Sequence, residues 1–460
     1  MIGLPPFLSF SENERILQLK ILMIILRTVK NISSLNIAAS VLLFLAAILA
    51  AVVANSSLSP VYQDFLLQEL HLRIGNFNLF SHGGHPLKMI EFINDCLMTV
   101  FFLAVGLEIK RELLVGELSS VRKAALPFIA ACGGMVVPVV IYALSVASST
   151  PETRGMAIPM ATDIAFSLGV LSLLGKRVPL SLKIFLTAFA VVDDIGGILV
   201  IALFYSADVA YGYLIAAAVL YVFLYYMGKF GVTQKIFFLF FGVIIWYLFL
   251  QSGIHSTISG VILAFVIPAR PRLDAGEYID RIRDIIGEFP VSKSDNIVLT
   301  NAQIATLKQV ERASDYVISP LQSLEDNLHG AVSFVILPLF AFANAGVVFS
   351  GSGSIVGDVS IAVAAGLLLG KFLGIYLFSW LAVKSGVALM PAGMNWKNIA
   401  GVSLLGGIGF TVSLFIANLS FADEYPELLN QAKFGVLVGT VLAGVLGYVV
   451  LNWVLPEREK

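Results

Sequence analysis

The chain has 460 residues, of which 58% are hydrophobic and only 13% are charged, so it carries more apolar surface than a soluble protein of this length could bury. Its 29 Lys and Arg almost balance its 30 Asp and Glu, and a net charge of -1 argues against nucleic acid as a partner. Cys96 and Cys132 both lie in apolar runs, which is typical of packing residues and not of a disulfide or a metal site. We therefore expect an integral membrane protein of the all-α class without a cofactor.

Twelve apolar stretches come close to the length of about 20 residues that an α-helix needs to cross a bilayer. The predicted spans are residues 36–54, 92–109, 126–148, 158–174, 180–205, 211–227, 236–250, 254–268, 331–349, 361–383, 399–419 and 434–455. Residues 36–268 then hold helices 1 to 8 and residues 331–455 hold helices 9 to 12. The remainder divides into an N-terminal segment, 1–35, a long loop, 269–330, and a tail, 456–460.

The Lys and Arg residues are distributed very unequally between the two sides of this predicted bundle. With Lys371 inside a span, 24 of the 29 Lys and Arg fall on the side of both termini and four fall on the other side. Because Lys and Arg concentrate in cytoplasmic loops, both termini and the loop 269–330 are expected on the cytoplasmic side of the membrane.

Three segments outside the spans have patterns of their own. Residues 16–26 are interrupted by Gln18 and Lys20, which favours an amphipathic cytoplasmic helix over a secretory signal. Polarity alternates in residues 70–74, and Gly75 and Asn76 precede Phe77, so residues 70–80 predict a small external β-hairpin. In the long loop, Thr300 and Gln303 are spaced as a capping box for a surface helix.

A few charged residues lie at a depth where they are costly. A charge at the centre of a bilayer costs roughly 2.5 to 3.5 kcal/mol on insertion scales. Asp163, Asp193, Asp194 and Lys371 lie deep within predicted spans, and a buried ion pair with one protonated carboxylate is the structural alternative to an ion or proton path. Adjacent helical residues point about 100° apart, so Asp193 and Asp194 are expected to differ in role, one lining a cavity with Asp163 and the other reaching for Lys371.

Two of the spans carry helix-breaking residues next to polar ones. Pro159 precedes Thr162 and Asp163 in span four, and Gly406, Gly407 and Gly409 lie in span eleven. Spans four and eleven are the middle members of the three-span units 3–5 and 10–12, and an offset of seven spans gives the units opposite topology. Paired interrupted helices of inverted repeats indicate an ion site near the middle of the membrane.

Other functions are possible for buried aspartates. An intramembrane prenyl transferase needs acids spaced to share a helix face, and the neighbours Asp193 and Asp194 do not have that spacing. A Na+-driven solute symporter is the nearer alternative, and it would require a solute pocket. A passive cation channel is disfavoured by Lys371 beside the cation path. The chain has no Walker-type glycine loop, so we do not expect ATP to supply energy.

Long motifs resemble the bacterial NhaA-type Na+/H+ antiporters over nearly every span. They are residues 92–112 (FINDCLMTVFFLAVGLEIKRE), 158–169 (IPMATDIAFSLG), 191–196 (VVDDIG), 337–346 (LPLFAFANAG) and 406–411 (GGIGFT). The resemblance implies a secondary transporter and not an enzyme, which exchanges cytoplasmic Na+ or Li+ for external H+ for sodium and pH homeostasis. It also implies pH regulation, electrogenic exchange, and a homodimer formed through the external hairpin.

The resemblance also implies roles for individual residues. Asp194 is expected to be the main Na+ ligand and proton carrier, with Asp163 and Thr162 beside it, and Asp193 is expected to pair with Lys371 and to release it when Na+ binds. Acids of the cytoplasmic funnel and the pH response, together with further pH-response positions, match Asp95, Glu108, Glu112, Glu325, His329 and His255. Two features depart from the family pattern, namely Asp326 where a histidine is common and the length of the loop 269–330. They concern the pH set-point and any regulatory partner, and not the ion site.

Overall fold

The computed structural model describes residues 37–74, 77–82, 85–146, 151–205, 209–271, 273–289, 298–349, 354–422 and 424–456. The predicted N-terminal amphipathic helix and nearly all of the predicted tail lie outside these residues.

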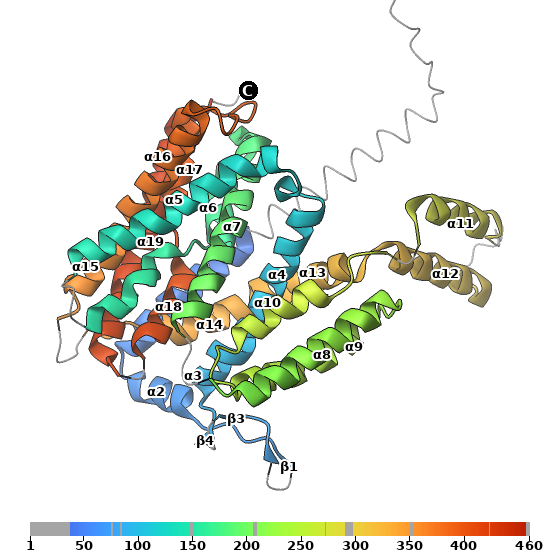
Figure 1. The fold of residues 1–460 in the computed structure, drawn as a ribbon, viewed down its shortest axis with the longest axis horizontal. Coiled ribbons are helices and arrows are strands. Elements are labelled where there is room, and N and C mark those ends of the chain that lie inside the picture. The colour runs from blue at the N-terminus through green and yellow to red at the C-terminus, as the bar shows by residue number, and fades with distance from the viewer. Residues whose placement is uncertain are drawn as a thin grey trace, which may run out of the picture.

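Helices occupy the positions of all twelve predicted spans (Figure 1). Eight are long and apolar enough to cross a membrane. Five of them are Ile37–Ala54, α5 (Val121–Ser145), α7 (Leu180–Phe204), α8 (Tyr211–Lys229) and α19 (Pro426–Val454). The other three each contain a π-helical turn: α3 (Met89–Phe92), η1 (Ile93–Leu97) and α4 (Met98–Leu114); α13 (Pro320–Ala331), η5 (Val332–Ile336) and α14 (Leu337–Asn344); and α15 (Asp358–Ala365), η6 (Gly366–Gly370) and α16 (Lys371–Lys384). Two further spans are bent pairs, and α9 (Lys235–Leu250) and α10 (Thr257–Val266) are shorter apolar helices. Helices are required because lipid offers no partner for a free backbone N–H or C=O group.

The two spans predicted to be broken are the two bent pairs. The 3₁₀ helix η3 (Pro151–Met160) meets α6 (Ile164–Leu173) at 45°, and α17 (Trp396–Leu405) meets α18 (Phe410–Phe421) at 44°. The first break follows Pro159. In the second break, three of the four residues from Gly406 to Gly409 are glycines. The prediction from helix-breaking residues is therefore confirmed at both places.

The two three-span units pack in corresponding ways. In the first unit α5 lies against α7, in the second α15 lies against α19, and the units meet where α5 packs on α16 and η3 packs on α18. The contact of α5 with α16 is close because Gly133 and Gly374 face each other with backbone against backbone. Small residues at a helix crossing permit this approach in a membrane. Figure 1 shows α5, α16, α17 and α19 as one group, with α8 and α9 at the edge of the molecule.

The segment that was predicted to be external contains more β-structure than one hairpin. β1 (Arg73–Ile74) pairs with β2 (Phe77–Asn78) in the expected antiparallel register, in which Arg73 faces Asn78 and Ile74 faces Phe77. A second two-stranded ladder, β3 (Ser81–His82) with β4 (His85–Pro86), follows directly. A short helix, α2 (Ser59–Leu67), precedes the strands.

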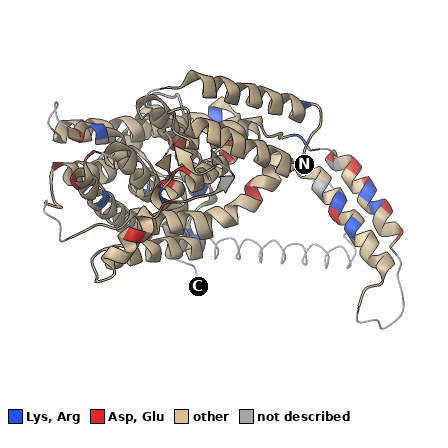
Figure 2. Cartoon of the chain, turned by 90° about the horizontal axis from the view of Figure 1, so that it is seen from below, with Lys and Arg blue, Asp and Glu red and all other residues tan. Residues whose placement is uncertain are grey.

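The loop between α10 and α14 is largely helical. The predicted surface helix is α12 (Asn301–Val317), which begins with the capping box of Thr300 and Gln303. An unpredicted helix, α11 (Ala275–Gly287), packs against it, and Figure 2 shows the pair projecting from the bundle with charged residues along both helices. The predicted end of the loop at residue 330 falls inside a helix, because Ser319 caps α13 (Pro320–Ala331) and Pro320 is its first residue.

The crossing of Gly133 and Gly374 gives a stability prediction. In Gly374→Ala the added methyl group overlaps the carbonyl oxygen of Gly133, and overpacking of this kind costs about 1 to 3 kcal/mol. We expect a lower melting temperature in detergent, measured by the loss of the size-exclusion peak after heating. Gly212→Ala on α8 is the control, since nothing lies within 4 Å of the added methyl group, and it should melt no lower than the parent. Equal melting of both variants and the parent would contradict this packing.

Candidate functional site

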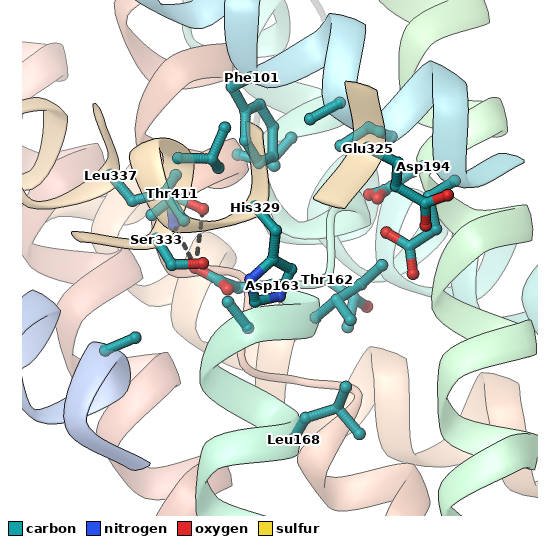
Figure 3. A pocket seen from close by; sticks show the side chains of 18 of the residues that line it. Phe101, Thr162, Asp163, Leu168, Asp194, Glu325, His329, Ser333, Leu337 and Thr411 are labelled. Atoms are coloured by element: carbon teal, nitrogen blue, oxygen red, sulfur yellow. Dashed lines mark hydrogen bonds between the residues drawn. The ribbon is translucent and has the colours of Figure 1, made fainter. Parts of the chain in front are cut away.

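A cavity of about 260 Å³ lies beside the break between η3 and α6 (Figure 3). Its polar lining comes from α4, the first break, α7, α13, η5 and α18, and comprises Glu108, Arg111, Thr162, Asp163, Asp194, Glu325, His329, Ser333 and Thr411. The structure therefore brings Asp163, Asp194 and Thr162 together, as predicted for a shared site. The remaining lining is apolar, which keeps the local dielectric low and strengthens electrostatic interactions.

Asp163 is held by the ends of both broken spans. It is the N-cap of α6, where its Oδ1 accepts a hydrogen bond of 3.0 Å from the backbone N–H of Phe166. Its Oδ2 accepts one of 2.7 Å from the hydroxyl of Thr411 and one of 3.3 Å from the backbone N–H of Thr411, near the start of α18. Because helix N-termini present unpaired N–H groups and a positive dipole end, this carboxylate lies where negative charge is favoured.

Further hydrogen bonds connect the two broken spans. The Thr162 hydroxyl donates to the carbonyl of Gly406 at 2.8 Å, and the backbone N–H of Asp163 donates to the carbonyl of Ile408 at 2.6 Å. The Ser167 hydroxyl donates to the carbonyl of Leu405 at 3.0 Å. The carbonyls that α17 leaves unpaired at its end are thus partly satisfied by the first broken span, so the two breaks form one unit.

Asp193 and Asp194 face different surroundings although they are neighbours on α7. Asp193 does not line the cavity, and its Oδ2 accepts a hydrogen bond of 2.7 Å from Lys371 Nζ in a fully buried ion pair. Asp194 is 7% exposed and lines the cavity with Asp163. The expected angle of about 100° between neighbours accounts for this division. Lys371 directly follows η6 (Gly366–Gly370), a π-helical turn of the kind frequent at functional sites.

The mouth of the cavity is a network of opposite charges. Arg111 Nε lies 2.9 Å from Glu325 Oε1, and Arg111 Nη2 lies 3.2 Å from Glu112 Oε1. Glu108 and His329 line the same cavity. Glu112 itself lines a second, more open hollow of about 340 Å³ together with Glu117, Lys123 and Lys183. That hollow is larger, yet it contains neither Asp163 nor Asp194, so the smaller cavity is the candidate ion site.

Two of the predicted pH-response residues lie elsewhere. Asp95 is in the π-helical turn η1 (Ile93–Leu97), near the opposite end of the span from Glu108. His255 Nε2 lies 3.8 Å from its carboxylate, and Ser256 donates to the same oxygen at 3.1 Å. Asp95 does not line the cavity, so the structure does not place it with Glu108 and Glu325 in one funnel.

Three polar residues of the cavity, Arg111, Ser333 and Thr411, were not proposed from the sequence. Thr411 closes the motif 406–411, where a hydroxyl next to a helix break mirrors Thr162 before Asp163, and that symmetry could have identified it. Arg111 entered the sequence analysis only through its positive charge, although it lies between Glu108 and Glu112 in the chain. Among the described residues no group of three His, Cys, Asp or Glu side chains is arranged to hold a metal ion.

Comparison with known proteins places the whole chain in one family. The family model described as Na+/H+ antiporter 1 matches residues 30–451. A relative from Bacteroides fragilis strain YCH46, "Na(+)/H(+) antiporter NhaA", is 74% identical over 437 residues, which are 95% of this chain and 100% of the relative. A relative of the same name from Bacteroides thetaiotaomicron is 74% identical over 95% of this chain and 100% of its own length. Another from Phocaeicola vulgatus is 61% identical over 89% of this chain and 92% of its own length. The chain therefore belongs to the Na+/H+ antiporter 1 family.

Proposed function

We propose that this protein exchanges cytoplasmic Na+ or Li+ for external H+ at the cavity between the two broken helices. The observation that carries the proposal is that Asp163 and Asp194 share one small cavity next to two helix breaks. The volume of about 260 Å³ is below the roughly 300 to 1,000 Å³ of typical organic-ligand pockets, which favours ions over a cotransported solute.

Competition for one site suffices for antiport. Two carboxylates in a low-dielectric cavity are costly when both are charged and unpaired, so the pair takes up a cation, either H+ or Na+. Asp194 is the main ligand and proton carrier in this proposal, while Asp163, anchored by Phe166 and Thr411, supplies a fixed second oxygen donor and Thr162 a neutral one. At alkaline cytoplasmic pH the site gives up H+ and binds Na+, and on the outside it exchanges Na+ for H+.

The buried pair of Asp193 and Lys371 is proposed to couple ion binding to charge movement. Asp193 does not line the cavity but directly precedes Asp194, and Na+ bound at Asp194 is proposed to release Lys371 from Asp193. If two titratable groups release protons for each Na+ bound, exchange is electrogenic. The mouth residues Glu108, Glu112, Glu325 and His329, and the separate pair of Asp95 and His255, are the proposed pH-responsive groups.

The protein is proposed to lie in the bacterial inner membrane with both termini in the cytoplasm. The support is the unequal distribution of Lys and Arg, which puts the mouth around Arg111 on the cytoplasmic side. A reporter fused to the C-terminus that is active only in the cytoplasm checks the orientation, and activity of an external reporter at that position would contradict it.

Replacement of the main ligand tests the function directly. In everted vesicles or proteoliposomes with a pH-sensitive dye, NaCl and LiCl should dissipate the pH gradient between about pH 6.5 and 8.5, more strongly at alkaline pH. Asp194→Asn keeps the size of the side chain but removes its charge, so we expect complete loss of this response with normal membrane insertion. Normal Na+-dependent proton movement in the variant would refute the assignment, and no response of the parent to any cation would favour a solute symporter.

The role of Lys371 has its own test. Lys371→Ala removes the cation paired with Asp193, so the charge moved in each cycle should change. Exchange rates measured at imposed membrane potentials in proteoliposomes should show an altered voltage dependence in the variant. A voltage dependence identical to that of the parent would contradict coupling through this pair.

A homodimer through the external hairpin is also proposed. β1 and β2 form a sheet of only two strands, and a sheet of this size leaves edges that can pair with a second chain. Replacement of residues 73–78 by a short Gly and Ser linker should convert a dimer to a monomer in size-exclusion chromatography with light scattering. A dimer of unchanged mass after this replacement would rule out the hairpin as the contact.

A further inference from the structure

The ammonium of Lys371 contacts two groups that come from one turn of α7. One is the carboxylate of Asp193, with Oδ2 at 2.7 Å, and the other is the aromatic ring of Phe189, whose centroid lies 5.6 Å from Nζ. All three side chains are buried, with exposed fractions of 0% for Lys371 and Phe189 and 1% for Asp193. The Asp193 contact was expected from the sequence, whereas the Phe189 contact was not.

The spacing along α7 explains why both groups reach the same ammonium. Phe189 and Asp193 are four residues apart, so their side chains lie on one face of the helix, one above the other. The ring and the carboxylate together form a slot for a cation, and Lys371 enters it from α16 (Lys371–Lys384).

The Phe189 ring lies close to two residues that lack side chains. A methyl group added at Gly134 of α5 would lie 3.2 Å from Cε2 of the ring, and one added at Gly406 would lie 3.3 Å from Cε1. The ring therefore fills the space between α5 and the break after α17. Gly406 is also the residue whose carbonyl accepts the hydrogen bond of Thr162, so the ring touches the unit that forms the proposed ion site.

The face of an aromatic ring attracts a cation, and the attraction acts within about 6 Å of the centroid. At 5.6 Å the ammonium is near the outer limit of this range while the carboxylate holds it. When the Lys371 ammonium leaves Asp193 it can move closer to the Phe189 ring. The attraction between ammonium and ring then increases in the same step in which the attraction between ammonium and carboxylate is lost. For a desolvated pair such an attraction shifts an equilibrium by about tenfold or more.

We propose that Phe189 is a positioning residue that receives the Lys371 ammonium when Na+ displaces it from Asp193. The inference rests on the proposed exchange of Na+ for H+, and it adds a specific determinant of Na+ affinity. By stabilising the released ammonium, the ring lowers the Na+ concentration that is needed to break the ion pair.

Fluorination of the ring separates this role from simple packing. Replacing Phe189 by 4-fluoro-, 3,5-difluoro- and 3,4,5-trifluorophenylalanine keeps the shape of the ring nearly constant while it weakens the negative face in steps. We expect the half-saturating Na+ concentration for proton movement in proteoliposomes, at one fixed pH, to rise with each step and to reach about tenfold for the trifluoro ring. Phe189→Leu should raise it at least as much, provided that the variant elutes as a folded protein.

Phe185 provides the matched control. It lies one turn earlier on α7, is 2% exposed and belongs to the same buried cluster, and no ring-to-cation contact involves it among the described residues. The same fluorinated residues at position 185 should leave the half-saturating Na+ concentration unchanged within about twofold.

The measurements distinguish failure of the role of Phe189 from failure of the proposed exchange of Na+ for H+. A half-saturating Na+ concentration that does not change with fluorination at position 189, or that changes equally at position 185, would overturn the role of Phe189 and leave the exchange intact. Absence of Na+-dependent proton movement in the unmodified protein would instead overturn the proposed function.

Discussion

The structure is organised around the cost of keeping carboxylates inside a membrane. Asp163, Asp193 and Asp194 are all buried, and each is compensated in a different way. Asp163 accepts hydrogen bonds at the N-terminus of α6 and from Thr411, and Asp193 is paired with Lys371, whereas Asp194 faces the cavity. Of these three, only Asp194 is left to be neutralised by something from solution, and this difference in compensation is why we propose it as the exchanging ligand.

The broken helices are what makes this compensation possible. A continuous helix uses its N–H and C=O groups internally, whereas the breaks after Met160 and Leu405 free backbone groups in the middle of the bundle. The carbonyls of Leu405, Gly406 and Ile408 then bind the other broken span, and the N–H groups at the start of α6 and α18 serve Asp163. Glycine at position 406 also leaves room for the ring of Phe189, which lies next to Lys371. The break after α17 therefore contributes both to the surroundings of Asp163 and to those of the Asp193 and Lys371 pair.

Hydropathy and helix-breaking residues were sufficient to predict the positions of the apolar helices, their order and the two breaks, since these depend on local composition. The angle between neighbouring helical residues predicted that one aspartate of α7 would meet Lys371, but not which one, because α7 is apolar around its whole circumference and its rotation is set by packing. The resemblance supplied that choice. The contacts of Asp163 with Thr411, of Arg111 with Glu325 and of Phe189 with Lys371 join residues far apart in the chain, and no local pattern encodes them. The helix α11 was missed because its isoleucines, Ile279, Ile282, Ile285 and Ile286, are interspersed with charged residues and form no continuous apolar run, although their spacing is helical. The start of α13 was predicted too late because hydropathy marks the apolar part of a helix and not its cap.

The central claim is that Na+ and H+ compete for one set of carboxylates. Titration calorimetry of Na+ binding to the purified protein in detergent, at several pH values and in buffers of different ionisation enthalpy, measures affinity and proton release together. The account predicts that the affinity for Na+ weakens about tenfold for each pH unit of acidification per proton displaced, with protons released as Na+ binds. An affinity that does not change with pH, without proton release, would contradict it.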